Sequence, residues 1–143
     1  MAPIEPIVIS VEAAVDAGLA WRYVSEPELI ERWFTAASQA RRVGEPYRLD
    51  FGDGSFVDGA VRALEPGRRL AYSWAWEGAD PRQETLVSWT VEALPRGGSR
   101  VTLVHDGWSE AGADGATRDD HAGYWEAYVD DLRALLEEAG RRG

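Results

Sequence analysis

The side chains that could support acid–base or metal chemistry near neutral pH are two histidines, His105 and His121. The chain has no cysteine and no lysine, which excludes thiol nucleophiles, disulfides, cysteine-bound metals and Schiff-base chemistry. The two histidines have neither HxH nor HxxxH spacing, so we expect no metal and no cofactor. The stretch 107–111, GWSEA, lacks the last glycine of a nucleophile elbow, so Ser109 is interpreted as a loop serine. The sequence therefore names no catalytic residue.

Aromatic residues carry the strongest functional signal. Seven tryptophans are more than a chain of this length usually has, and their indole N–H groups need partners when buried. An incompletely filled interior, open to a ligand, would supply such partners more easily than a solid aromatic core, which remains the alternative. The residues predicted to line this cavity are Trp33, Phe34, Tyr47, Phe51, Tyr72, Trp74, Trp76, Trp89, His105, His121, Trp125 and Tyr128.

Within this set, the two histidines and the short-helix aromatics have predicted places. His105 shares a strand face with apolar residues, so it is either a hydrogen-bonded core histidine or a polar anchor for a ligand. His121 falls on the same helix side as Trp125 and is expected at one end of the groove. Trp33 and Phe34 are expected to close its mouth. Trp108, next to a glycine, is a candidate exposed contact, for instance in a homodimer.

The spacing of apolar residues predicts the elements that position these side chains. A strand is expected around residues 7–11, followed by helices over 13–25 and 27–34. Period-two patterns between about residues 47 and 105 predict five antiparallel strands, with a hairpin turn at Gly52 to Ser55. An amphipathic helix is expected from Thr117 to Gly140. This order predicts one α+β domain over residues 1–143, with helices on one side of the sheet.

Charge and composition limit the partners. A net charge of −10 opposes association with nucleic acid and with anionic membranes. The N-terminal stretch has no basic region and no long apolar run, so neither a signal peptide nor a membrane span is expected and the location is predicted to be cytoplasmic. Fifteen arginines with no lysine or asparagine are typical of a GC-rich bacterial genome.

Four stretches resemble one family in the order in which that family has them. They are AWRYVSEPELIERWF (20–34), RRLAYSWAWEG (68–78), VTLVHDGW (101–108) and HAGYWEAYVDDLRALLE (121–137). These stretches are similar to SRPBCC proteins, in particular to the branch named for the activator of heat-shock protein 90 ATPase homologues. The resemblance implies a START-like, helix-grip fold, in which a curved antiparallel sheet grips a long C-terminal helix and encloses a cavity.

The resemblance leaves three functions open. The first is binding of a small hydrophobic or aromatic ligand, because this branch shares no set of catalytic residues. The second is a polyketide cyclase or aromatase-like enzyme, in which His105, Tyr128 or an inward carboxyl would act as an acid or base. The third is a co-chaperone that activates an ATPase. A chaperone partner is disfavoured for this chain, because the eukaryotic co-chaperones carry an additional N-terminal domain.

Overall fold

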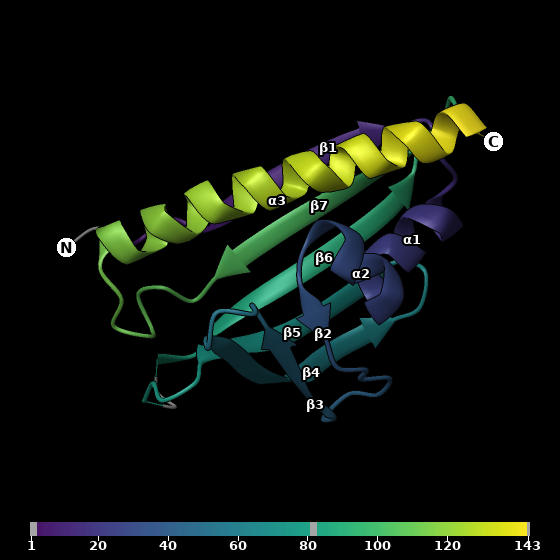
Figure 1. Ribbon diagram of the computed structural model, residues 1–143. Coiled ribbons are helices and arrows are strands. Elements are labelled where there is room, and N and C mark those ends of the chain that lie inside the picture. Colours follow the sequence, from purple (N-terminus) through teal and green to yellow (C-terminus); the bar gives the residue numbers. More distant parts are fainter. Residues whose placement is uncertain (1–2, 81–82, 143) are drawn as a thin grey trace.

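The sheet of this protein is a curved antiparallel layer (Figure 1). The computed structural model describes residues 3–80 and 83–142, and these residues form seven strands. Along the sheet the order is β1-β7-β6-β5-β4-β3-β2, so the first strand pairs with the last. The strands are β1 (Ile7–Ala13), β2 (Ala36–Ala37), β3 (Pro46–Asp50), β4 (Phe56–Glu65), β5 (Arg69–Trp76), β6 (Thr85–Ala93) and β7 (Ser99–Asp106). The predicted domain also includes Met1, Ala2, Pro81, Arg82 and Gly143, which lie outside the described residues.

The described residues also form three helices, α1 (Ala17–Ser25), α2 (Pro27–Trp33) and α3 (Gly115–Arg142). Asp16 caps α1, because its carboxylate accepts a 2.8 Å hydrogen bond from the backbone N–H of Leu19. Pro27 begins α2 at a position where its missing N–H costs no helical hydrogen bond. Helix α1 therefore begins later than the predicted residue 13, because β1 continues through Ala13 and the cap is Asp16.

The long helix α3 differs from its predicted boundaries at both ends. It begins at Gly115, before the predicted cap Thr117, because the Asp114 carboxylate accepts a 2.8 Å hydrogen bond from the Thr117 N–H. It also continues past Gly140, the predicted terminator. A Cβ at position 140 would lie 2.7 Å from the backbone oxygen of Ala14, so this glycine allows the helix to approach the chain that follows β1.

Helix α3 covers one face of the sheet, along β1 and β7, on the same side as α1 and α2 (Figure 1). Its buried side chains recur every three or four positions and are Trp125, Val129, Leu132 and Leu136. The Trp125 ring lies 5.4 Å from that of Trp74 and 5.8 Å from that of Trp89. The other face of α3 is polar. No helix in the described part of the chain is long and apolar enough to cross a membrane. The arrangement confirms the α+β, helix-grip fold that the resemblance implied.

The alternation of β5 decides which rings face α3. Trp74 is 4% exposed and packs against α3, as the predicted parity requires. Trp76, at the end of the strand, is 37% exposed, yet its indole Nε1–H donates a 3.1 Å hydrogen bond to His121 of α3. The short strand β2, which pairs with β3, was not predicted, because two residues cannot show a period-two pattern.

Strands β4 and β5 approach each other closely beside these rings. A Cβ at Gly59 would lie 2.0 Å from the carbonyl oxygen of Ser73 and 2.7 Å from the ring of Tyr47. The Tyr47 phenol donates a hydrogen bond to the same carbonyl oxygen, and burial raises the pKa of Tyr47. A register shift between Val61 and Ala63 of β4 adds to the irregularity. Only glycine fits where the strands approach so closely.

Candidate functional site

The aromatic side chains between the sheet and α3 divide into two neighbouring pockets, with Phe34 lining both. The Phe34 ring lies 6.4 Å from Trp74, 5.0 Å from Trp125 and 4.8 Å from Tyr128. Of the other predicted site residues, Trp33, Tyr47, Tyr72 and Trp89 line the first pocket, which we call the inner pocket. The second pocket, which we call the outer pocket, is lined by Phe51, Trp74, Trp76, His121, Trp125 and Tyr128.

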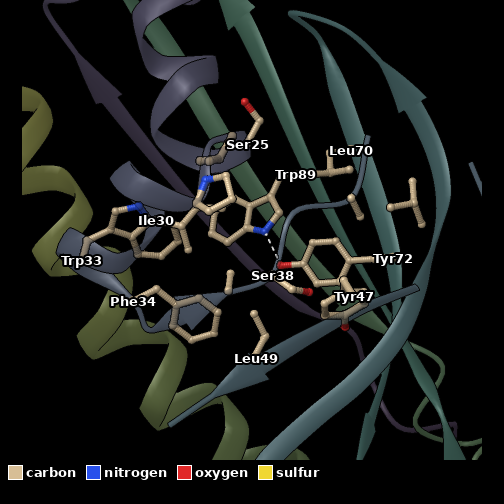
Figure 2. Close-up of a pocket in the computed structure, with 15 residues that line it drawn as sticks. Ser25, Ile30, Trp33, Phe34, Ser38, Tyr47, Leu49, Leu70, Tyr72 and Trp89 are labelled. Carbon is tan, nitrogen blue, oxygen red and sulfur yellow. Dashed lines mark hydrogen bonds between the residues drawn. The ribbon is translucent and has the colours of Figure 1, made fainter. Parts of the chain in front are cut away.

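The inner pocket is small and is surrounded by aromatic rings (Figure 2). Its volume is about 50 Å³, whereas pockets for drug-sized ligands have about 300–1,000 Å³. The indole Nε1–H of Trp89 donates a 3.0 Å hydrogen bond to the hydroxyl oxygen of Tyr72, and burial raises the pKa of Tyr72. This half of the predicted cavity is therefore a packed aromatic core.

Trp33 and Trp108 lie deeper than predicted. Trp33 is 4% exposed and does not close a mouth, because its indole Nε1–H donates a 2.8 Å hydrogen bond to the carbonyl oxygen of Tyr23. Trp108 is 2% exposed and is not a surface contact, because its Nε1–H donates a 2.9 Å hydrogen bond to the carbonyl oxygen of His105. The adjacent Gly107 suggested an exposed loop, but the indole of Trp108 points from this loop into the interior.

The outer pocket has room for a ligand, at about 440 Å³. Strand β5 forms one wall, α3 a second, and Phe51 with the turn between β3 and β4 a third. The sequence interpretation missed Asp53 and Ser55 of this turn, because a hairpin turn was assigned no further role. It also missed Tyr124, which lines the pocket while 70% exposed. The helical spacing of Tyr124 from Trp125 and Tyr128 could have placed it on this face.

A hydrogen bond between β5 and α3 bounds the outer pocket on one side. The Nε1–H of Trp76 donates to Nε2 of His121, while Nδ1 of His121 lies 2.8 Å from the carbonyl oxygen of Thr117. Because an indole N–H can only donate, Nε2 must accept, and the imidazole is neutral with its hydrogen on Nδ1. A further pocket of about 290 Å³ lies on the other side of this pair, next to Trp108.

His105 is a core histidine whose two ring nitrogens are both engaged. Nδ1 accepts a 2.9 Å hydrogen bond from the indole N–H of Trp125, so the hydrogen of the ring is on Nε2. That nitrogen lies 2.6 Å from the hydroxyl of Thr85. Burial, and then the proximity of His121, lower the pKa of His105 well below its usual range. Of the two predicted interpretations, these contacts favour the core histidine.

Acidification is expected to destabilise the fold through His105. The unfolded chain takes up a proton on this residue as the pH falls below about 6.5, whereas the folded chain does not until much lower pH. The free energy of unfolding should therefore fall with pH, by up to about 1.4 kcal/mol per pH unit. Urea unfolding between pH 7.5 and about pH 5, where most carboxyls stay ionised, measures this slope. His105→Gln should flatten it; an unchanged slope in His105→Gln would contradict the assignment.

Trp74 differs from most of the other tryptophans in the hydrogen bonding of its indole N–H. Five indoles donate to identified acceptors, those of Trp33, Trp76, Trp89, Trp108 and Trp125. The Trp74 indole N–H is buried and has no hydrogen-bond partner among the described residues, although its side chain lines the outer pocket. An unpartnered buried donor costs about 1–3 kcal/mol. Such a group calls for an explanation, and the Trp74 side chain lines both the outer pocket and the pocket next to Trp108.

Among the described residues, the site shows no arrangement for a metal. In the part of the chain that the structure describes, no three His, Asp or Glu side chains come together where they could hold an ion. The chemistry that this arrangement supports is recognition of an apolar molecule by ring faces, with a few polar atoms to orient it.

A sheet that curves around a long C-terminal helix, with an aromatic pocket between them, defines this chain as a helix-grip domain. Residues 14–137 match the family model described as activator of Hsp90 ATPase homolog 1-like protein, and the chain belongs to this family. A comparison with curated proteins found no match.

Solved structures share the fold. DynU16, from the dynemicin biosynthetic locus, is 27% identical with a TM-score of 0.82, and the match covers 94% of this chain and 48% of DynU16. The chain therefore spans about half the length of that protein. MLL2253 from Mesorhizobium loti is 22% identical, with a TM-score of 0.81 and coverage of 94% and 98%. The Aha1 dimer from Colwellia psychrerythraea is 20% identical, with a TM-score of 0.76 and coverage of 93% and 96%.

Proposed function

We propose that this protein is a cytoplasmic, bacterial binding protein that holds a small apolar or aromatic molecule in the outer pocket. The observation that carries the proposal is a pocket of about 440 Å³ whose walls are aromatic rings from three parts of the fold. A ligand of that size would bury its surface against Phe51, Trp74, Trp76 and Tyr128.

The contacts of His105 favour binding over a cyclase-like reaction at this residue. An acid–base group must exchange a proton with the bound molecule. For a histidine, this requires a ring nitrogen within hydrogen-bonding reach of that molecule. Both nitrogens of His105 are instead engaged by Trp125 and Thr85, and its side chain is fully buried. His105 therefore supports the wall of the pocket.

Phe51→Ala is expected to weaken binding in the outer pocket about tenfold, because the ligand loses one aromatic wall. The neutral dye N-phenyl-1-naphthylamine is a suitable probe, since its fluorescence rises when it leaves water for an apolar site. Its dissociation constant would be measured by titration. The matched control is Leu70→Ala, which removes apolar atoms from the inner pocket alone and should leave the dissociation constant unchanged.

The two variants separate the outcomes. Binding that weakens in Phe51→Ala and persists in Leu70→Ala supports the outer pocket. Binding that weakens only in Leu70→Ala would move the site to the inner pocket. Absence of any dye binding by the folded wild-type protein, together with no binding of other neutral aromatic probes, would contradict the proposed function.

We extend the proposal to assembly. The similar Colwellia structure is a dimer, and this chain is proposed to form a homodimer as well. Light scattering on the purified protein tests this directly. A mass of twice 15.8 kDa would support the homodimer, and a mass of 15.8 kDa across the concentration range would contradict it.

A further inference from the structure

The outer pocket presents electron-rich ring faces and a negative charge to its occupant. Aromatic faces carry the negative part of the ring quadrupole, and they make up most of the pocket wall. Among the described residues that line the pocket, the acidic side chain is Asp53, and none is an arginine. The whole chain, with a net charge of −10, adds to this field.

Asp53 is held as a carboxylate at the pocket rim. Its Oδ1 accepts a 3.0 Å hydrogen bond from the backbone N–H of Ser55 and another from the Ser55 hydroxyl. These hydrogen bonds lower the pKa of Asp53. Both hydrogen bonds from Ser55 are accepted by Oδ1 of Asp53 and not by Oδ2. The charge acts on the pocket, since it contributes, after burial, to the raised pKa of Tyr128.

The imidazole in the pocket wall, that of His121, does not offset this charge. Accepting the indole N–H of Trp76 on Nε2 requires a neutral His121, whose remaining hydrogen is directed to the Thr117 carbonyl oxygen. The pocket therefore combines uncharged rings with one carboxylate. This combination attracts cations and repels anions.

Building on the proposed function, we propose that the ligand of the outer pocket is an organic cation, with an ammonium nitrogen attached to an apolar or aromatic body. The body would pack between Phe51 and Trp125, and the cation would lie against the ring of Tyr128, on which the charge of Asp53 acts. A quaternary ammonium suits this setting, because it is weakly hydrated and needs no hydrogen-bond acceptor. Cation–π attraction and the carboxylate then act on the same charge.

A pair of isosteric competitors tests the charge preference. Trimethylphenylammonium and tert-butylbenzene have the same shape. They differ in one central atom, which is a positively charged nitrogen in the first and a neutral carbon in the second. Each would be used to displace N-phenyl-1-naphthylamine from the wild-type protein, and the half-displacing concentrations compared. We expect the cation to displace the dye at a concentration about tenfold lower than the hydrocarbon.

Two charge-neutralising variants locate the effect. Asp53→Asn should reduce the preference for the cation severalfold, because it removes the rim charge while keeping the shape of the side chain. Glu31→Gln changes the net charge equally on α2, away from the pocket lining, and should preserve the preference. Equal displacement by both competitors, or a preference that survives in Asp53→Asn, would overturn the inference and leave the proposed function intact. Failure of the dye to bind at all would instead contradict the proposed function.

Discussion

Gly59→Ala is expected to lower the free energy of unfolding by about 3 kcal/mol or more. A Cβ at this position would overlap the Ser73 carbonyl, at 2.0 Å, and the Tyr47 ring, at 2.7 Å. Neither obstacle can move easily, because Ser73 belongs to the backbone of β5 and the Tyr47 phenol is bonded to that same carbonyl. Strands β4 and β5 would have to separate beside the pocket. Chemical denaturation of both proteins measures the difference.

Gly123→Ala provides the matched control, because it makes the same chemical change where there is space. Gly123 lies in α3 on the exposed surface, and a Cβ there meets no atom within 4 Å. Alanine should raise the free energy of unfolding by about 0.5–1 kcal/mol, since glycine is unfavourable inside a helix. Equal effects of the two substitutions would contradict the close contact between β4 and β5.

His105→Leu is expected to cost about 2–4 kcal/mol of unfolding free energy, although leucine is apolar and similar in volume. The substitution leaves the indole N–H of Trp125 buried without its acceptor, and the hydroxyl of Thr85 keeps only its 3.4 Å hydrogen bond to the carbonyl oxygen of Trp74. The unsatisfied indole N–H carries a desolvation penalty that the folded state cannot recover. Urea unfolding at pH 7.5 would measure the loss without contribution from histidine protonation.

A double substitution separates this cause from simple loss of packing. Trp125→Phe removes the stranded donor, so the double variant His105→Leu with Trp125→Phe should lose less stability than the sum of the two single losses. Strict additivity of the two single effects would show that the hydrogen bond between the two rings contributes nothing to stability. The loss in His105→Leu would then come from altered packing alone.

Alternation and helical spacing were sufficient to predict the inner face of the sheet and of α3. The predicted parity of β5 turns Trp74 toward α3, although Ala71 and Ser73 on the opposite face of the strand are buried as well. The step of three and four residues likewise placed Trp125 toward the sheet. These patterns depend on burial, which acts on every residue of an element, and they can be read from one sequence.

The division of the predicted cavity into two pockets could not be read in this way. It depends on how far Phe34 reaches across the interior from the end of α2, a tertiary distance that no local pattern encodes. The roles of Asp53 and Ser55 were hidden for a related reason. Turn residues are chosen for backbone conformation, so their types do not reveal which pocket the turn borders. Trp108 was mistaken for a surface residue because its carbonyl partner belongs to the preceding strand.

The outer pocket, and not the inner one, is expected to take a small aromatic molecule, and the indole groups report on this directly. Trp74, Trp76 and Trp125 line the outer pocket, whereas Trp33 and Trp89 line the inner one. The measurement is a titration of ¹⁵N-labelled protein with N-phenyl-1-naphthylamine, following the indole ¹H–¹⁵N resonances. The largest shifts are expected at Trp74, Trp76 and Trp125. No shift at a saturating concentration, or the largest shifts at Trp33 and Trp89, would contradict binding in the outer pocket.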